Sequence, residues 1–136
     1  MSDWNADIIE EFRANEGRVG GPFEGANMIL ISTVGARTGA VRTTPVVYFP
    51  QEDGSMLIVA SKGGAPTNPD WYHNVRANPV FEVEVGARRF AVEAAVLTPE
   101  ERAVAWPRIV EAAPGFGDYQ RKTDRIIPVV RLTPKD

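Results

Sequence analysis

The sequence contains no cysteine and only one histidine, His73, among its 136 residues. The absence of cysteine excludes a disulfide framework, a thiolate nucleophile and a cysteine metal site. One histidine supplies too few imidazole ligands for a histidine-based metal centre, so we expect no bound metal. A chain of this length can bury about two-thirds of its unfolded surface, and its stability therefore requires neither disulfides nor metals.

The sequence also lacks any apolar run near the roughly 20 residues that cross a bilayer. Its start, MSDWNADIIEEF, lacks the cationic and apolar parts of a signal peptide. We therefore expect a cytoplasmic protein. An apolar helical stripe in this segment leaves open a peripheral position at the inner face of the membrane. Anionic lipid would repel Asp7, Glu10 and Glu11 on the polar side, so membrane association is not favoured.

Acidic residues are missing from two stretches of a chain whose net charge is −3. That net charge argues against general nucleic-acid binding. None of the 18 acidic residues lies between Gly25 and Gln51, and only Asp70 lies between Gly54 and Phe81. Those stretches hold instead a set of cations and hydroxyls: Arg37, Arg42, Lys62, Arg76, Ser32, Thr33, Thr38, Thr43, Thr44, Ser61 and Thr67. Such a surface suits a small anionic ligand, although strands contain few acids in any protein.

Apolar periodicity and turn signals predict about six strands, an N-terminal helix and two or three short helices. We expect helices over residues 5–15, 69–77 and 98–112. We expect strands over residues 28–31, 41–49, 56–60, 81–85, 88–97 and 126–132. Most connections are of hairpin length, so the fold class is α+β, a small barrel of mainly antiparallel strands. Residues 1–136 form a single domain, with a helix and loop over 1–24 and the barrel over 25–136.

Local signals predict where these elements begin, bend and end. The glycine-rich segment from Gly17 to Gly25 is expected to be a loop. Pro45, inside the second strand, indicates a sheet edge or a bulge, where a backbone can open toward a ligand. Asn68-Pro69 predicts an N-cap and the first helical residue, and Thr98-Pro99-Glu100-Glu101 predicts a capping box. Pro114 to Asp118 is expected to be a loop.

Several well-known catalytic motifs are absent. No glycine cluster links a strand to a long helix, which excludes a P-loop and a dinucleotide fingerprint. A serine triad lacks its nucleophile-elbow sequence, and His73, beside Trp71 and Tyr72, is typical of a packed or surface histidine. The carboxylates are scattered over strand and helix faces, so no pair of them predicts hydrolysis by two acids.

Two glycine-containing loops and one short helix remain as candidates for a binding site. Gly35-Ala36-Arg37-Thr38-Gly39 combines a guanidinium, a hydroxyl and flexible backbone N–H groups, which together can hold a phosphate. Ala60-Ser61-Lys62-Gly63-Gly64 combines another cation and hydroxyl with two glycines. Trp71 and Tyr72, at a helix N-terminus, offer an aromatic wall for a planar heteroaromatic ligand, unless they are simply core residues.

These blocks, in this order, resemble the deazaflavin-dependent nitroreductase family. The resemblance rests on GARTGAVRTTPVVY, on VASKGGAPTNPDWYHNVRANP and on the C-terminal FGDYQRKTDRIIPVVRL, and it extends back to EFRANEGRVGG near the N-terminus. Members of this family use coenzyme F420, an 8-hydroxy-5-deazaflavin, and fold as a split β-barrel related to flavin-mononucleotide-binding oxidases. The resemblance implies an F420H2-dependent reductase that transfers a hydride to an activated enone, a quinone or a nitroaromatic.

The resemblance also implies roles by position. Arg37 and Thr38 would hold the cofactor phosphate, with Ala36 where relatives often carry a second basic residue. The residues implied to lie along the deazaflavin and its linker are Arg42, Thr43, Thr44, Pro45, Val46 and Val47. Those implied to meet its head group are Ala60, Ser61, Lys62 and Gly63. Those implied to close the site near the phosphate and the anionic tail are Trp71, Tyr72, His73 and Asn74.

The proton donor and several partners stay open at this stage. Some nitro-reducing relatives present a cluster of tyrosines over the substrate, whereas this chain has Phe116 at one such place and Tyr119 nearby. Tyr119 or Tyr48, or a water that they order, would protonate the product, because a phenol can donate a proton and a phenyl ring cannot. Alternatives are flavin mononucleotide (FMN) as the cofactor of the same barrel, and a non-catalytic F420 carrier. The protein would be a monomer or a homodimer.

Overall fold

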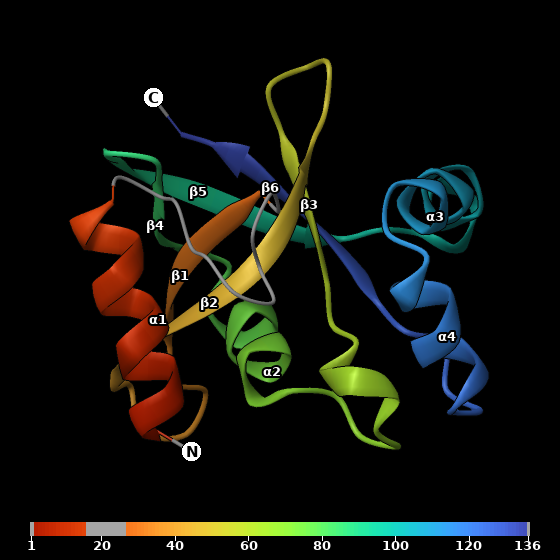
Figure 1. The fold of residues 1–136 in the computed structure, drawn as a ribbon, viewed down its shortest axis with the longest axis horizontal. Helices are drawn as coiled ribbons and strands as arrows, with labels where there is room; N and C mark the ends of the chain where they lie inside the picture. The colour runs from red at the N-terminus through yellow and green to blue at the C-terminus, as the bar shows by residue number, and fades with distance from the viewer. Residues whose placement is uncertain (1, 16–26, 136) are drawn as a thin grey trace.

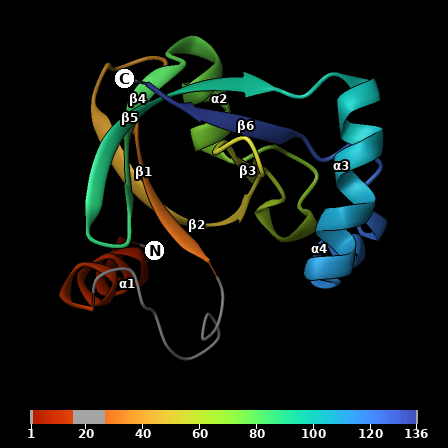
Figure 2. The same cartoon turned by 90° about the horizontal axis from the view of Figure 1, so that it is seen from above.

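The computed structural model describes residues 2–15 and 27–135. Its central feature is a closed antiparallel barrel with the strand order β1-β2-β3-β6-β5-β4 (Figure 2). The strands are β1 (Met28–Val34), β2 (Val41–Pro50), β3 (Met56–Val59), β4 (Val80–Val85), β5 (Arg88–Val96) and β6 (Val129–Pro134). The predicted α+β barrel is confirmed. The predicted loop from Gly17 to Gly25 lies outside the described residues.

The barrel interior is filled by the inward-facing side chains of its strands. Ile29 and Ile31 alternate along β1, and with Val83, Val92 and their neighbours they form one buried cluster. The side chains between them on β1 are buried too, because helix α1 (Ser2–Ala14) covers the outside of that strand. Both faces of β1 are therefore protected from water, as its continuous apolar run predicts.

Two further helices cover the outer face of the barrel where β3 and β6 pair. These are α3 (Pro99–Ala112) and α4 (Gly115–Arg121), on the side of the barrel away from α1 (Figure 1). Leu57, Ile109, Ile127 and Val129 form the buried cluster between them. The capping box of α3 is confirmed: Thr98 Oγ1 accepts from the N–H of Glu101 at 3.2 Å, and the Glu101 carboxylate accepts from the N–H of Thr98 at 2.9 Å.

Three local predictions were wrong. The segment predicted as a loop from Pro114 to Asp118 belongs largely to helix α4, and the last strand begins at Val129 rather than at 126. Helix α2 (Asp70–Ala77) is preceded by Pro69 in the N-cap position, and no side chain caps it. The Asn68 side chain accepts a hydrogen bond from Arg125 instead.

Pro45 lies at an open edge, as predicted. Residues 41–47 of β2 pair with β1, whereas β2 pairs with β3 only from Tyr48 onward. The N–H of Tyr48 donates to the carbonyl of Asn27, so by antiparallel alternation the nitrogen of Pro45 faces away from β1. Among the described residues no strand pairs with that edge, and the missing N–H of proline therefore breaks no ladder bond.

Antiparallel pairing brings the candidate loops to one end of the barrel. The turn after β1 leads into the start of β2, and β3, which runs against β2, ends on the same side. Helix α2 and the turn that follows β3 lie together at the lower end of Figure 1. Segments far apart in the sequence can thus contribute to a single site.

Candidate functional site

The turn after β1 is closed by short-range hydrogen bonds. The N–H of Gly35 donates to the carbonyl of Ala40 at 2.8 Å, and the N–H of Gly39 donates to the carbonyl of Gly35 at 3.0 Å. Thr38 Oγ1 accepts from the N–H of Ala40 at 3.2 Å, and Gly39 has a φ of +72°, which glycine adopts without strain. Among the described residues, the N–H groups of Arg37 and Thr38 meet no acceptor. They remain available to an anion.

Asn74 joins this turn to helix α2. Its side-chain oxygen accepts from the N–H of Ala36 at 3.0 Å, and its amide nitrogen donates to the fully buried hydroxyl of Thr33 at 3.4 Å. One helical turn later, the Asn78 amide donates to the carbonyl of Val34 at 3.2 Å. The helix therefore fixes the turn through side chains rather than through apolar packing.

The turn and the helix enclose a groove of about 620 Å³. Its lining residues are Gly35, Ala36, Arg37, Thr38, Ala40, Arg42, Asp70, His73 and Asn74. Arg37 and Arg42 are both exposed, and Asp70 is the single carboxylate of this lining. With two guanidiniums and free backbone N–H groups, the groove has the donors that a phosphate requires.

The second candidate loop includes a short 3₁₀ helix, η2 (Lys62–Gly64). Ala60 is fully buried and Ser61 is 9% exposed, whereas Lys62 is exposed and donates to Thr67 Oγ1 at 3.3 Å. Lys62 has a φ of +47°, which is unusual for a residue with a side chain. Of this loop, Lys62 is therefore the side chain most open to a ligand.

Arg125 holds the second loop, and the sequence interpretation missed it. Its guanidinium donates to the carbonyls of Ala60, Ser61 and Ala65 and to the side chain of Asn68. No local pattern could have identified it, because Arg125 lies 64 residues after Ser61.

The site residues predicted between 42 and 48 all lie on β2, which pairs with β1 along one side and is open along the other side as far as Val47. Thr43 Oγ1 is 3.0 Å from the hydroxyl of Ser32. Arg42 is exposed. The other predicted residues on β2 are half-buried: Thr43, Thr44, Pro45, Val46, Val47 and Tyr48. Val46 and Tyr48 pack against the barrel interior. The remaining surface of these side chains is what a ligand could contact.

The structure separates the aromatic candidates. Trp71 and Tyr72 are each 8% exposed and belong to the barrel interior, whereas His73 is exposed beside Tyr72. Tyr119 lies in the cluster beneath α3 and α4, with its ring 5.7 Å from that of Phe116. Tyr48 and Tyr119 thus belong to different clusters.

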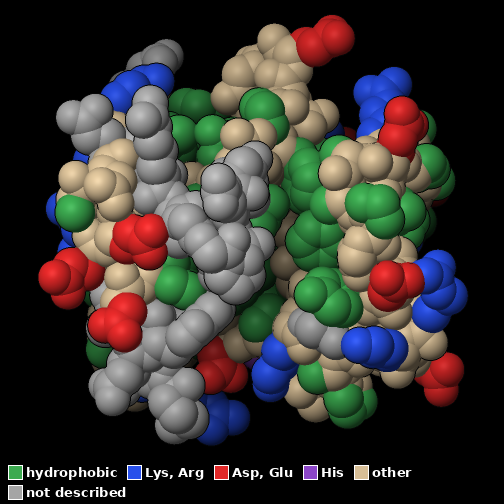
Figure 3. Space-filling view, in the orientation of Figure 1, with side chains coloured by type: hydrophobic (Ala, Val, Ile, Leu, Met, Phe, Trp, Pro, Cys, Tyr) green, Lys and Arg blue, Asp and Glu red, His purple; other side chains and the backbone are tan. Residues whose placement is uncertain are grey.

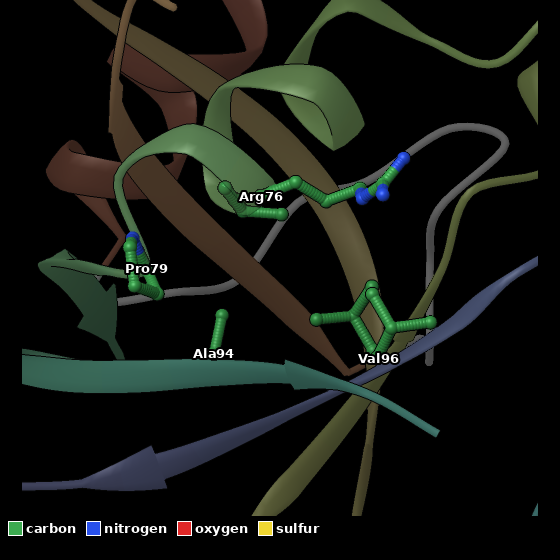
Figure 4. A pocket seen from close by; sticks show the side chains of 6 residues that line it. Arg76, Pro79, Ala94 and Val96 are labelled. Atoms are coloured by element: carbon green, nitrogen blue, oxygen red, sulfur yellow. The ribbon is translucent and has the colours of Figure 1, made fainter. Parts of the chain in front are cut away.

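Other hollows of the described residues lie away from the turn, and one of about 200 Å³ at the β4–β5 turn has a lining that includes Arg13, Glu84, Gly86 and Arg88. A groove of about 200 Å³ runs between α2 and β5, where Arg76 extends above Ala94 and Val96 (Figure 4). A groove of about 650 Å³ lies between the β2–β3 hairpin and α3, where Figure 3 shows hydrophobic side chains at the surface. The grooves beside α2 and α3 contain no glycine turn with a cation beside it, whereas the hollow at the β4–β5 turn has Gly86 beside Arg88 and also holds Glu84.

The described residues include no group of three or more histidine or carboxylate side chains arranged to hold a metal ion. The helices over residues 2–15 and 27–135 are also too short or too polar to span a lipid bilayer.

Comparison with known proteins bears on the cofactor and the activity. Residues 5–134 match the family model described as F420H(2)-dependent quinone reductase. An F420H(2)-dependent quinone reductase of Mycobacterium tuberculosis is 44% identical over 126 residues, which cover 90% of this chain and 84% of that protein.

Solved structures agree in fold. An F420-H2 dependent reductase has a TM-score of 0.69 at 42% identity, with 78% of this chain and 93% of the other covered. A second structure, described as a domain-swapped dimer, has a TM-score of 0.72 at 37% identity and covers 96% and 98%. The resemblance seen in the sequence is confirmed. The chain belongs to the F420H(2)-dependent quinone reductase family, and it is an oxidoreductase with coenzyme F420 as its cofactor.

Proposed function

We propose that this protein binds F420 across the Gly35–Ala40 turn and the Ala60–Gly64 loop and reduces a quinone. The observation that carries the proposal is the groove lined by Arg37, Arg42 and the free N–H groups of the turn. F420 carries a phosphate and several carboxylates, and these donors suit such a ligand. Bound reduced F420 supplies the hydride, and the protein supplies orientation and electrostatics.

We assign the anion-binding role first to Arg37 and Thr38. The Arg37 guanidinium is exposed, and the turn leaves two N–H groups beside it. Ala36 adds no charge, so the phosphate depends on Arg37 and on Arg42 from the start of β2. Asp70, on the same groove, opposes an anion and limits the affinity.

We assign the head group to the edge of β2 and to the second loop. The exposed parts of residues 43–47 offer an apolar and hydroxyl surface, and Lys62 offers a cation. The side chains of Ala60 and Ser61 are buried and their carbonyls accept from Arg125, so these two residues position the loop beneath the head group. Trp71 and Tyr72 support the groove from the barrel interior, and His73 and Asn74 line it.

We propose Tyr48 or Tyr119 as the proton donor to the reduced product. Replacing Tyr119 with phenylalanine keeps the ring against Phe116 and removes only the hydroxyl. A lower turnover number with unchanged F420 affinity would assign the proton to Tyr119. An unchanged turnover number would remove it from the mechanism and leave Tyr48 as the candidate.

A binding titration tests the site itself. Arg37→Ala should weaken the binding of oxidised F420 by about 1.5–3 kcal/mol, the usual contribution of a charged hydrogen bond. Arg108→Ala is the matched control, because Arg108 is an exposed arginine in the groove beside α3. FMN in a parallel titration tests the alternative cofactor. Equal F420 affinity of the two variants would disprove the role of Arg37.

Turnover assays define the acceptor. Quinones are the first expectation, and enones and nitroaromatics are the comparison set. Tight F420 binding with no acceleration of its oxidation by any acceptor would favour the carrier alternative.

We further propose that two copies associate and that the protein acts in the cytoplasm without docking to a membrane. A relative at 37% identity is described as a domain-swapped dimer. The apolar residues Ile8 and Phe12 of α1 are buried against the barrel, and Asp7 and Glu10 are exposed, which disfavours contact with anionic lipid. Light scattering and flotation with anionic vesicles test the two statements separately.

A further inference from the structure

Arg125 binds both ends of the loop that carries Lys62. Its Nη2 donates to the carbonyl of Ser61 at 2.7 Å, and its Nη1 donates to the carbonyl of Ala60 at 3.2 Å. At the far end of the loop, Nε donates to the carbonyl of Ala65 at 2.9 Å and Nη1 donates to Asn68 Oδ1 at 2.7 Å. A planar guanidinium has the fixed donor fork that such a set of acceptors needs, and an ammonium does not.

The conformation held by Arg125 is one that the loop would not favour by itself. Lys62 has a φ of +47°, in the left-handed region that is unusual for a residue with a side chain, whereas Gly64 adopts its φ of +85° without strain. Within the loop, the N–H of Gly64 donates to the carbonyl of Ser61 at 2.9 Å, and the N–H of Ala65 donates to the carbonyl of Lys62 at 3.1 Å. The Ser61 carbonyl therefore accepts from both the loop and Arg125. Such a left-handed residue persists where its surroundings hold it.

Arg125 is itself fixed by a chain of hydrogen bonds that reaches α3. The Gln120 amide donates to the carbonyl of Arg125 at 2.7 Å. The Gln120 side-chain oxygen accepts from Arg102 Nη2 at 2.9 Å and from the N–H of Ile127 at 3.0 Å. Arg125, whose guanidinium acts as a clamp on the loop, is thus held by the C-terminal part of the fold.

The hydrogen-bond acceptors of the Arg125 guanidinium within the described part of the chain are all uncharged oxygens. Among the described residues, no carboxylate forms an ion pair with Arg125 or with Lys62. Burial lowers the pKa of Arg125, yet an arginine stays protonated at neutral pH. Two uncompensated cations therefore lie in or beneath one loop, which favours an anionic ligand there.

We propose that Arg125 is a positioning residue of the cofactor site: it holds the Ala60–Asn68 loop in the conformation that presents Lys62 to F420. The inference rests on the proposed function, in which this loop meets the cofactor. Arg125 acts through the loop rather than by touching the cofactor.

The test compares Arg125→Lys, which keeps the charge and loses the fork, with the wild-type chain. We expect the N–H groups of Gly64 and Ala65 to exchange with solvent about tenfold faster, and oxidised F420 to bind about tenfold more weakly, as for lost charged hydrogen bonds. Arg121→Lys is the matched control, because within residues 2–15 and 27–135 Arg121 forms an ion pair only with Asp118, at the surface of α4. It should change neither quantity.

Asn68→Ala removes one acceptor and keeps the clamp on the three carbonyls, so it serves if Arg125→Lys does not fold. We expect about threefold effects on both quantities, a fraction of one charged hydrogen bond. Unchanged exchange, or faster exchange with unchanged F420 affinity, would overturn the positioning role. A wild-type chain that does not bind F420, with loop exchange still raised in the variants, would overturn the proposed function and leave only the clamp.

Discussion

The turn over Gly35–Ala40 and the loop over Ala60–Asn68 contain similar residues but are held in different ways. Both follow a strand at the same end of the barrel, and both combine a cation, a hydroxyl and glycines. The turn is closed by its own backbone and by Thr38, and Asn74 attaches it to α2. The loop depends on Arg125, which lies far along the chain.

The two parts of the proposed cofactor site therefore differ in whether neighbouring or distant residues hold their conformation. A turn closed within a few residues keeps its shape wherever those residues are kept. A loop held by a side chain from the C-terminal region can be altered by changes that touch neither the loop nor the ligand. We therefore expect the turn, the proposed phosphate end of the site, to be the more robust part, and the loop, the proposed head-group end, to be sensitive to α4 and the segment after it.

The largest effect should come from a matched pair of glycine substitutions. At Gly64 a Cβ would lie 2.7 Å from the carbonyl oxygen of Tyr119, and φ is +85°, whereas at Gly39 φ is +72° and nothing lies within 4 Å. Gly64→Ala should lower the free energy of unfolding by about 3 kcal/mol, since strain and overpacking add, and Gly39→Ala by about 1 kcal/mol from strain alone. Urea denaturation measures both. Equal losses would show that α4 is not pressed against the loop.

The next effect concerns the link between the turn and α2. Asn74→Ala leaves the N–H of Ala36 and the buried hydroxyl of Thr33 without partners and should cost about 2 kcal/mol. Asn78→Ala removes a single bond to Val34 and should cost about 1 kcal/mol. Only Asn74→Ala should also weaken F420 binding. If Asn78→Ala weakens it equally, the helix and not the side chain positions the turn.

A smaller effect should distinguish the hydroxyls of the two regions. Thr38→Val removes the acceptor of the Ala40 N–H and should cost about 1 kcal/mol, together with some F420 affinity. Thr67→Val removes an exposed contact with Lys62 and should cost less than about 0.5 kcal/mol. Thermal unfolding with and without F420 measures both. A larger loss for Thr67→Val would reverse the ranking of the two regions.

The smallest effect should be a pH dependence of the free energy of unfolding that leaves the turn and the loop unchanged. Arg13 hydrogen-bonds the Glu84 carboxylate and thereby lowers its pKa below the usual 4.5. A lowered folded-state pKa stabilises the protein above the unfolded value, and this contribution is lost as pH falls through the folded value. Arg13→Gln should remove less than about 1 kcal/mol at pH 7, because Arg13 is 51% exposed, and nothing once Glu84 is protonated. Denaturation at pH 7 and pH 3 checks this. Faster hydrogen exchange in the Gly35–Ala40 turn or the Ala60–Asn68 loop at pH 5 would contradict the expectation that acid leaves both regions unchanged.

Much of the fold was predictable because its signals are short-range. Alternating and continuous apolar runs predicted all six strands of the barrel, and the spacing of Thr98 and Glu101 predicted the capping box. The turn over Gly35–Ala40 was predictable for the same reason, since the residues that close it lie next to one another. Pro45 predicted the open edge because proline tolerates few positions in a sheet.

Helix α4 was not predictable from such signals. Its sequence, GFGDYQR, contains two glycines, and only Phe116 and Tyr119 are apolar residues at helical spacing, which is too short a pattern to predict a helix. The helix forms because Phe116 and Tyr119 pack into the cluster beneath α3. Gly117 permits a close approach, since a Cβ there would lie 3.2 Å from Val110. Asn68 was misassigned as an N-cap because Arg125 takes its side chain.

By itself, the sequence determined the strands of the barrel, the cationic turn and the family resemblance, because each can be recognised from short runs of neighbouring residues. Only the tertiary structure decided that Trp71 and Tyr72 face the barrel interior, that Asn74 fastens the turn, and that Arg125 holds the loop of Lys62. Those outcomes depend on which distant segments meet once the barrel closes. The hydrogen bonds of a guanidinium depend on the distance and direction to its acceptors in space, and the order of the residues does not specify either.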